Sequence, residues 1–562
     1  MNRFARAFRS FALVLPLVGM VPPAVAQAPA PAQTAKAAPL PWLYRNSDVP
    51  PDPEWVFGEL SNGVRYAVRR NGVPPGQVSI RVRIDMGSLA EKPEEAGYAH
   101  LIEHLVFRQS KYLGEAQAIP TWQRLGASFG NDTNAETTPT HTVFKLDLPN
   151  ATPPALEESF KLLSGMITAP TLSEANIRAE VPIVLAEMRE RGGTAMRVQD
   201  ATRQTFYAGQ PLAERSPIGT VATLQGATQA SVRAFHARWY RPQNAVIIAA
   251  GDVDTAQLEA LTKRWFGDWK VPGKAVSAPV FGDPKAPAGA DPANPVGETR
   301  VLVEPDLPRG ISFAVLRPWR QVNDTIVYNQ GRMTEALALA LINRRLEARA
   351  RGGGSYLIAQ VSQENGSRSV DGTFVSVTPL TADWQAALRD VRAVIADAIA
   401  TPPTEDEIAR EVAEMNVAFE SSVEQRALLP GSRVADDLVQ ALDIRETVAS
   451  PEAVLDIFRR SVPQFTPQAV LERTRALFAG TVTRGIYMTP VAGEGDAAAL
   501  KAALLAPVAP DGSARLASAP ISFADMPALG QPAKAVTITP TGLLGIEQVD
   551  LGNGVKALIW PT

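Results

Sequence analysis

The stretch GYAHLIEHLVF, residues 97–107, carries two of the four histidines in this 562-residue chain. His100, Glu103 and His104 are spaced i, i+3 and i+4, so their side chains share one face of a helix. Two imidazoles on one face can bind a single metal ion, with a carboxylate beside them. The apolar residues around them would pack this helix inside a domain. The motif alone leaves open an alternative, a pair of buried, hydrogen-bonded histidines.

The chain contains no cysteine, which excludes disulfides and leaves histidine, aspartate or glutamate for any further metal ligand. Zinc in a catalytic site takes three protein ligands and one water. The helical pattern over 173–193 offers Glu180 and Glu187 on one face, two turns apart. Their apolar neighbours imply that both carboxylates need partners, which a metal and a ligand histidine would provide. The alternative at this point is an exposed acidic stripe paired with arginines of the same helix.

These segments resemble the insulinase/pitrilysin family, the zinc peptidases whose motif is the inverted H-x-x-E-H. HLIEH is followed farther along the chain by Glu187 in EVPIVLAEMRE. Three further stretches are similar to signature segments of that family: NAETTPTHTVFKL (134–146), QPLAERSPIGTVATLQ (210–225) and FHARWYRPQNAVIIAAGDVD (235–254). Together the similarities cover most of residues 55 to 270.

The resemblance implies a set of metal-site residues in this chain. One Zn²⁺ per chain would be bound by His100, His104 and Glu187. Glu103 would be the general base, which accepts a proton from the zinc-activated water as that water attacks the scissile carbonyl. Glu180 matches the upstream glutamate that supports a ligand histidine from behind.

The resemblance also bears on the residues around the site. Asn134 and Ala135 match a stretch whose backbone can pair with an extended substrate. Two departures from the family pattern bear on specificity or loop shape more than on zinc binding: VFRQSKYL lacks the Gly-Thr that usually follows the motif, and Thr140 stands where an acidic residue is common. His141 and His236 are interpreted as structural residues.

Strand and helix patterns alternate along the chain, and their order repeats after a Pro/Gly/Ala-rich stretch. The predicted fold is α+β, with two tandem insulinase-like domains, each a mostly antiparallel sheet with helices packed on it. The predicted segments are a signal peptide (1–26), an Ala/Pro-rich linker (27–50), the catalytic zinc-binding domain (51–270), a linker (271–297), a non-catalytic domain (298–506), a linker (507–543) and the start of a truncated third domain (544–562).

The N-terminus predicts export. Three arginines precede a short, proline-broken apolar run, and Ala24-Val25-Ala26 fits a small-x-small cleavage site. We therefore expect a mature protein in the periplasm or outside the cell, with cleavage near Ala26. An uncleaved membrane anchor is the alternative. The net charge of −3 gives no sign of a nucleic-acid partner.

The last residues, QVDLGNGVKALIWPT (548–562), look like a copy of GELSNGVRYAVRR (58–70). Asn-Gly between strand-forming residues is a strong hairpin signal. The family resemblance implies two halves that close around a chamber, on one chain or on paired subunits. We interpret the copy as the start of a second half, poorly packed by itself. Full activity is then expected to need a second half, a partner subunit or a homo-oligomer.

The favoured function is an exported zinc metalloendopeptidase that cleaves peptides or unfolded polypeptides. One alternative is a non-catalytic subunit with this fold, and another is a periplasmic zinc-binding protein without hydrolysis. The motif with both histidines and Glu103 argues against the first alternative. The substrate and its cleavage preference do not follow from the sequence.

Overall fold

The computed structural model describes residue 42 and residues 46–190, 192–515, 535–542 and 545–560, which fall into two compact units, 1–516 and 517–562. The predicted signal peptide and most of the first predicted linker lie outside these residues. Among the helices that the structure describes, none has the length and apolar character needed to cross a bilayer.

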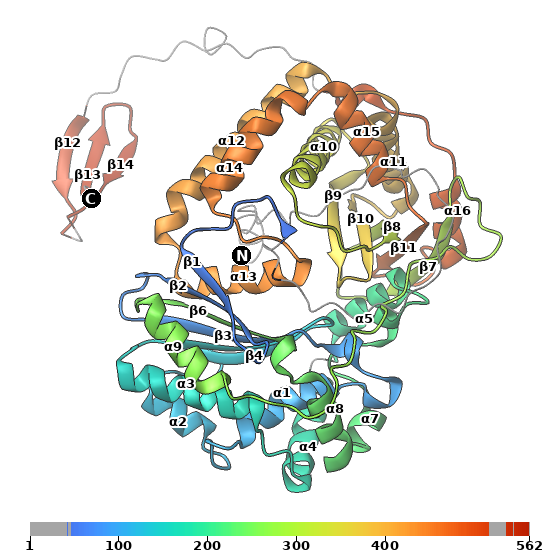
Figure 1. The fold of residues 1–562 in the computed structure, drawn as a ribbon. Helices are drawn as coiled ribbons and strands as arrows, with labels where there is room; N and C mark the ends of the chain where they lie inside the picture. The colour runs from blue at the N-terminus through green and yellow to red at the C-terminus, as the bar shows by residue number, and fades with distance from the viewer. Residues whose placement is uncertain (1–41, 43–45, 191, 516–534, 543–544, 561–562) are drawn as a thin grey trace. The chain divides into compact units, whose positions relative to one another are not determined.

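A six-stranded sheet forms the first half of the larger unit (Figure 1). Neighbouring strands run antiparallel except for one parallel pair, β2 with β6. In spatial order the strands are β1 (Trp55–Glu59), β2 (Arg65–Arg70), β6 (Ala245–Gly251), β3 (Val78–Ile84), β5 (Thr142–Leu148) and β4 (Thr133–Thr137). This mostly antiparallel sheet is the one that the sequence predicts.

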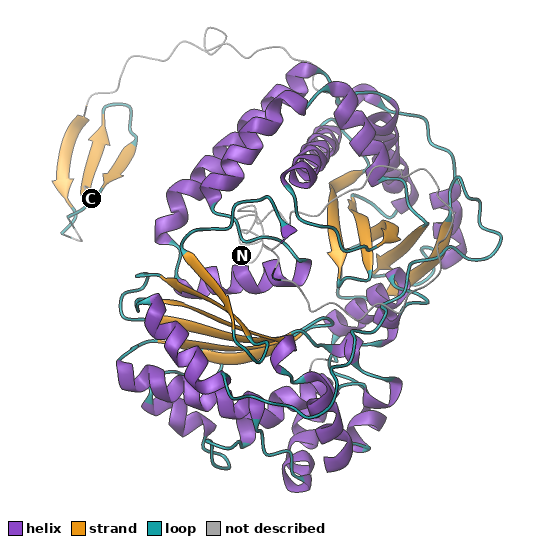
Figure 2. Ribbon diagram, viewed as in Figure 1, coloured by secondary structure: helices purple, strands orange, loops and turns teal. Residues whose placement is uncertain are grey.

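Helices cover one face of this sheet and form the main core with it (Figure 2). Apolar side chains of the strands, such as Ile80 and Phe144, meet Leu101 of α1 and Phe160 of α3 in that core. The helices of this part are α1 (Tyr98–Arg108), α2 (Ala118–Arg124), α3 (Pro153–Thr168), α4 (Glu174–Glu190), α6 (Pro211–Glu214), α7 (Val221–Gln225), α8 (Gln229–Trp239) and α9 (Thr255–Phe266).

The second half of the larger unit repeats this plan with a five-stranded sheet that also has one parallel pair, β7 with β11. Its strands in spatial order are β7 (Val296–Val303), β11 (Val482–Thr489), β8 (Gly310–Pro318), β10 (Val370–Pro379) and β9 (Tyr356–Gly366). Its helices include α10 (Ile326–Arg351), α11 (Trp384–Ala400), α12 (Glu405–Gln425), α14 (Pro451–Ser461), α15 (Pro467–Leu477) and α16 (Ala497–Leu505). The tandem α+β architecture predicted from the sequence is confirmed.

Each half of the larger unit packs one of its helices on the sheet of the other half. The helix α13 (Gly431–Ile444) packs Leu438 and Leu442 on the first sheet, on the face opposite α1 and α3 (Figure 1). In return, α5 (Thr194–Phe206) packs Phe206 against the second sheet. Each half therefore completes the other's core, and both lie in one compact unit.

Buried ion pairs accompany this exchange. Asp85, just after β3, pairs with Arg368 from the β9–β10 turn at 3.1 Å and with Arg445 at the end of α13 at 2.7 Å. Asp443 on α13 pairs with Arg83 of β3 at 3.1 Å. Burial alone would raise the pKa of both carboxyls, but Arg445 and its neighbours lower the pKa of Asp85 well below its ordinary value. The pKa of Asp443 is lowered in the same way, by His141 and two arginines.

Acid is therefore expected to weaken the contact between the halves. A carboxyl whose pKa is depressed in the fold stabilises it above the unfolded pKa of about 3.9, and this stabilisation is lost as the pH falls. We expect Asp443→Asn to be less stable than the wild type at neutral pH and to lose less stability on acidification. Urea unfolding across about pH 3 to 7 measures this, with Asp456→Asn in an exposed pair with Arg460 as the control. An equally steep acid dependence in Asp443→Asn would count against this assignment.

The smaller unit is a three-stranded antiparallel sheet of β12 (Ala535–Pro540), β13 (Glu547–Leu551) and β14 (Lys556–Ile559). Its β13–β14 turn has the hydrogen bonds of the first hairpin: Leu551 N–H to Val555 O at 2.8 Å matches Leu60 N–H to Val64 O at 2.8 Å. Val64 is fully buried, whereas Val555 is 52% exposed. As expected, the copied hairpin is poorly packed.

One element of this unit differs from the sequence-based interpretation. The linker predicted over 507–543 contains β12, because AVTITP alternates apolar and polar residues and pairs with β13. The Pro/Gly/Ala-rich composition around this strand hides that alternation.

Candidate metal centre

The helix α1 carries His100 and His104, and a side chain from the preceding loop binds the free amides at its N-terminus. The Glu91 carboxylate accepts hydrogen bonds from the amides of Gly97 and Ala99, both at 2.9 Å. Amides at a helix start have no partner within the helix, so Glu91 satisfies two of them. Burial raises the pKa of Glu91 to about 8 despite these bonds. Glu91 is not predicted from the sequence, because it precedes the helix without a familiar capping spacing.

Two glycines set the approach of a neighbouring loop to this N-terminus. Gly97 (φ +93°) and Gly219 (φ +76°) are both left-handed, and a Cβ on Gly219 would lie 2.5 Å from the Gly97 Cα. Gly219 is the glycine of the SPIG stretch, so that signature segment acts by packing against the start of α1.

Gly219→Ala is expected to destabilise the fold by about 2–4 kcal/mol, because it combines an unfavourable φ with a clash against backbone. Gly209→Ala is the matched control: its φ is +77°, and no atom lies within 4 Å of the added Cβ. Thermal unfolding of both variants separates the two costs. Equal losses in Tm would show that the close approach contributes nothing.

The helices α1 and α4 pack together and bring His100, His104 and Glu187 to one point. Glu187 Oε2 lies 3.6 Å from His100 Nε2 and 3.4 Å from His104 Nε2. The three ligand atoms all lie within 4.8 Å of one another. His100 is buried, whereas Glu187 and His104 are partly exposed and leave the site accessible from solvent.

This donor set fits zinc. Zinc binds imidazole nitrogen and carboxylate oxygen at about 2.0–2.2 Å in tetrahedral geometry, which separates neighbouring ligand atoms by about 3.3–3.5 Å. The nitrogen-to-oxygen distances of 3.6 and 3.4 Å match that separation. Three protein donors also leave a fourth position for water, as catalytic zinc requires.

Glu180 lies behind His104, two helical turns before Glu187 on α4. Its Oε2 is 3.5 Å from His104 Nδ1, on the ring nitrogen opposite the one that faces Glu187. Arg108 donates to Glu180 Oε1 at 3.0 Å and to Asn176 Oδ1 at 3.3 Å. Burial opposes ionisation of Glu180, but its bonds to His104 and Arg108 lower its pKa overall. This arrangement can fix the ring orientation of His104.

Arg108 is a further residue of the site that was not predicted, although its position in the sequence carries a signal. Residues 100, 104 and 108 are spaced four apart on one helix, which places Arg108 on the face of the two histidines. Glu180 was already expected to need a partner. The Glu180 carboxylate has two partners: it contacts the ring of His104, and it pairs with the positive charge of Arg108.

Glu103 lies on α1 beside the histidine pair and is 9% exposed. Thr137 Oγ1, at the end of β4, donates a hydrogen bond to Glu103 Oε2 at 2.5 Å. Burial raises the pKa of this carboxyl to about 7, while Thr137 and His104 act in the opposite direction. A carboxyl with this pKa can take up and release a proton near neutral pH.

Asn134 and Ala135 lie on β4, at the edge of the first sheet. In the part of the chain that the structure describes, β4 pairs with β5 on one side and carries no strand on the other. Asn134 is exposed, and its Oδ1 accepts from the Ala135 amide at 2.8 Å. The outer edge of β4 is therefore the side on which an extended chain could add.

The remaining histidines lie outside the cluster. His236 is partly buried, stacks on Tyr240 with 4.4 Å between ring centroids, and has its Nε2 3.0 Å from the Ile167 carbonyl oxygen. Burial lowers its pKa to about 4. His141 is buried beside Asp443, with Nδ1 3.2 Å from Oδ1. Both have the structural surroundings expected from the sequence.

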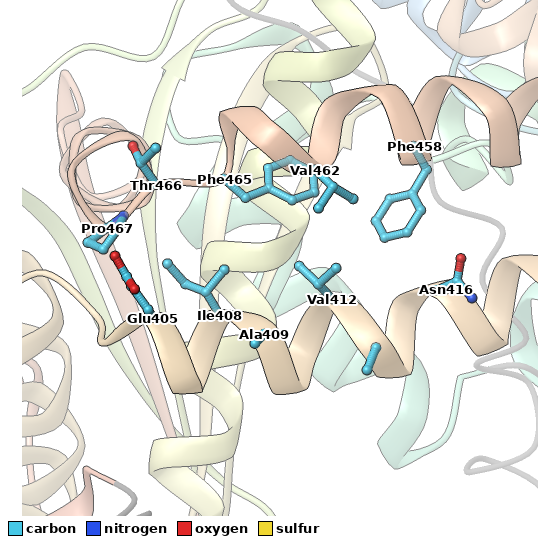
Figure 3. A pocket seen from close by; sticks show the side chains of 11 residues that line it. Glu405, Ile408, Ala409, Val412, Asn416, Phe458, Val462, Phe465, Thr466 and Pro467 are labelled. Atoms are coloured by element: carbon cyan, nitrogen blue, oxygen red, sulfur yellow. The ribbon is translucent and has the colours of Figure 1, made fainter.

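A cavity of about 530 Å³ lies apart from this cluster, between α12 and the segment joining α14 to α15 (Figure 3). Ile408 and Val412 of α12 face Phe458, Val462 and Phe465 across it. Its lining is mostly apolar and includes none of the candidate metal ligands. It does not belong to the metal centre.

Comparison with known proteins finds two family matches that follow one another along the chain. "Insulinase (Peptidase family M16)" matches residues 67–216, and "Peptidase M16 inactive domain" matches residues 226–415. The first match contains the whole histidine and glutamate cluster. The second spans the linker and much of the second half.

Among curated relatives, the probable zinc protease PqqL of Escherichia coli is 33% identical over 215 residues, which are 38% of this chain and 23% of PqqL. The chloroplastic stromal processing peptidase of Oryza sativa is 28% identical over 284 residues, which are 48% of this chain and 20% of that protein. The matched segments thus span less than a quarter of either relative.

Solved structures show the same fold. The crystal structure of the first half of the periplasmic protease PqqL from Escherichia coli has a TM-score of 0.74 at 24% identity, covering 82% of this chain and 99% of that one. The whole PqqL structure has a TM-score of 0.75 at 22% identity, covering 91% of this chain and 56% of that one.

Proposed function

The chain belongs to the insulinase family of peptidases, family M16, and on that premise we propose that it is an exported zinc metalloendopeptidase of peptides or unfolded polypeptides. The observation that carries the proposal is the meeting of His100, His104 and Glu187, with ligand atoms within 4.8 Å of one another, next to the buried carboxyl of Glu103. Three side chains that can bind zinc, beside a buried carboxyl that can act as a base, are the equipment of a hydrolase.

In this proposal His100, His104 and Glu187 hold one zinc ion per chain. Zinc, when bound, supplies an acidified water and a Lewis acid for the scissile carbonyl. Glu103 accepts the proton of the attacking water and then delivers it to the leaving amine. Glu180, held by Arg108, keeps the ring of His104 oriented for binding.

The substrate would lie extended along the free edge of β4. Backbone groups of Asn134 and Ala135 would pair with it, as strands add to exposed sheet edges. An extended backbone is available in peptides and unfolded chains but not in most folded proteins. This is why we propose peptides or unfolded polypeptides as the substrate class.

Full activity would require a second half or a partner subunit. Support comes from the structural match, in which this chain covers 99% of the first half of PqqL but 56% of the whole protein. Export through the predicted signal peptide is part of the proposal, and it is supported by PqqL of Escherichia coli, which is a periplasmic protease.

Metal removal tests the proposed function. We expect the purified protein to contain one zinc per chain, to cleave an unfolded polypeptide, to lose that activity on dialysis against a chelator and to regain it with zinc. If the chain alone proves inactive, the same assay with an added second-half partner decides the case. Zinc at one per chain without cleavage in either assay would favour a zinc-binding protein, and undetectable zinc would favour a non-catalytic subunit.

A further inference from the structure

We propose that the second half of the larger unit positions the Glu103 carboxylate through the β4–β5 turn. Thr137 contacts Glu103 directly, and Arg368 and Asp443 hold the turn from the other side. The inference rests on the proposed function in that it takes Glu103 as the general base. Thr137 and Arg368 are then positioning residues for this reaction, and neither is a ligand of the metal.

The first step is the bond between Thr137 and Glu103. Thr137 is the last residue of β4, and its Oγ1 donates to Glu103 Oε2 at 2.5 Å. The Thr142 hydroxyl, at the start of β5, lies 3.4 Å from the Thr137 hydroxyl. Since Glu103 is almost fully buried, water cannot easily replace this donor. The position of the strand end therefore sets the direction of the carboxylate.

The second step is the attachment of the turn to the first half. The amide of Ser88 donates to the Thr138 carbonyl oxygen at 3.1 Å, and the amide of Leu89 donates to the Pro139 carbonyl oxygen at 2.9 Å. A Cβ on Gly87 would lie 2.0 Å from the Thr138 oxygen, so the backbones approach closely. Two of the turn's carbonyl groups are thus bound by neighbouring backbone.

The third step crosses to the second half. Arg368, in the β9–β10 turn, donates from Nη2 to the Thr140 carbonyl oxygen at 3.0 Å. The Thr140 hydroxyl donates to Asp443 Oδ1 on α13 at 2.6 Å, and His141 Nδ1 lies 3.2 Å from the same oxygen. Thr140 and His141 are each 4% exposed, and Arg368 is buried. Hydrogen bonds to charged groups in such a place are strong and specific.

These three steps form one continuous path. It runs from Arg368 through the Thr140 carbonyl and the turn backbone to Thr137, and from there to Glu103. Loss of the Arg368 bond should let the turn shift and loosen the Thr137 bond. The effect must then depend on Thr137, which makes the path testable by combining substitutions.

The chain offers a matched control for the contact between the halves. Asp436 lies on α13, as Asp443 does, and pairs with Arg81 of β3 at 2.8 Å. This pair also joins the two halves, but none of its hydrogen bonds reaches the turn. Asp436 also lies 3.6 Å from Lys145 of β5, which pairs with Glu136 of β4. Asp436→Asn therefore weakens the interface at Arg81 and Lys145 and removes no hydrogen bond of residues 137–141.

The main experiment is a double-mutant cycle of Thr137→Val and Arg368→Met, read as kcat and KM on an unfolded polypeptide with zinc content checked. We expect Thr137→Val to lower kcat by about tenfold, with KM changed less than about twofold, because one hydrogen bond to a buried charged group is lost. Thr137→Ser should restore most of kcat. As a single substitution, Arg368→Met should lower kcat. Combined with Thr137→Val, it should lower kcat little further.

Additive losses in the double variant would contradict the path, and so would full activity of Thr137→Val. Asp436→Asn combined with Thr137→Val should be additive. If Arg368→Met does not fold, Arg368→Lys keeps a positive charge near Asp85 and Asp443 while removing the guanidinium geometry. It should show the same dependence on Thr137.

A second measurement needs no activity. Hydrogen–deuterium exchange of the segment 133–142 should rise in Arg368→Met and stay at the wild-type level in Asp436→Asn. Unchanged exchange in Arg368→Met overturns the attachment of the turn to the second half. If the wild-type protein shows no cleavage that depends on Glu103, the proposed function and the catalytic part of this inference are both wrong. The exchange result still decides the structural part.

Discussion

Glu103→Gln is expected to lower kcat for peptide cleavage by about a thousandfold, or about 4 kcal/mol in the barrier, while zinc remains at one per chain. Glutamine has the shape of glutamate and can still accept the hydrogen bond that Thr137 donates at 2.5 Å. It cannot accept or deliver a proton. The substitution therefore removes the proton transfer and leaves the packing of α1 and the metal ligands in place.

The measurement is single-turnover cleavage of an unfolded polypeptide, with zinc content and Tm determined on the same preparations. Glu136→Gln is the matched control, because Glu136 lies on the neighbouring β4 with its side chain 56% exposed, paired with Lys145. It should keep near wild-type activity. Zinc-replete Glu103→Gln with more than about a tenth of wild-type kcat would contradict the role of Glu103 as general base.

Glu187→Gln is expected to weaken zinc binding by more than about a hundredfold and to abolish cleavage at sub-stoichiometric zinc. It replaces an anionic donor that lies 3.6 and 3.4 Å from the two histidine nitrogens. A neutral amide oxygen is a poorer zinc ligand than a carboxylate. The effect should exceed that of changing an outer residue of a zinc site, which costs about 10–100-fold in affinity.

Glu180→Gln supplies that comparison on the same helix. Glu180 contacts His104 from behind and is expected to bind no metal itself. Competition with a chelating dye measures the zinc affinity of both variants. Equal affinities for Glu180→Gln and Glu187→Gln would contradict the assignment of Glu187 as a ligand and of Glu180 as the support of His104.

The parts of the site within single helices could be read from the sequence. The spacing of His100, Glu103 and His104 places them on one helix face whatever the rest of the chain does, and the same holds for Glu180 and Glu187. The helix predicted over 173–193 is observed as α4 (Glu174–Glu190). That the two faces meet was supplied by the family resemblance, since no local rule specifies which helices pack together.

The parts that depend on distant contacts were not predictable from local patterns. The apolar stripe of α13 (Gly431–Ile444) requires a partner surface but does not say that this surface is the sheet of the other half. Likewise, nothing near Thr137 in the sequence indicates that its hydroxyl reaches Glu103. Glu91 binds the start of α1 through a turn with no standard spacing. Such contacts depend on tertiary packing and not on periodicity.

The two similar hairpins show what a local motif does predict and what it does not. Asn62-Gly63 and Asn553-Gly554 form turns with the same backbone hydrogen bonds, so the local motif determines the local turn. Burial differs, because Val64 packs in a complete domain and Val555 does not. A local motif therefore predicts a turn in both places but not its environment.

The central claim is that His100, His104 and Glu187 hold a single zinc ion, and anomalous diffraction at the zinc edge tests it most directly. Crystals of the zinc-loaded protein should show one anomalous peak per chain within about 2.0–2.2 Å of a nitrogen of each histidine and an oxygen of Glu187. A zinc-loaded crystal with no peak at this point, or with the peak bound by other residues, would contradict the account.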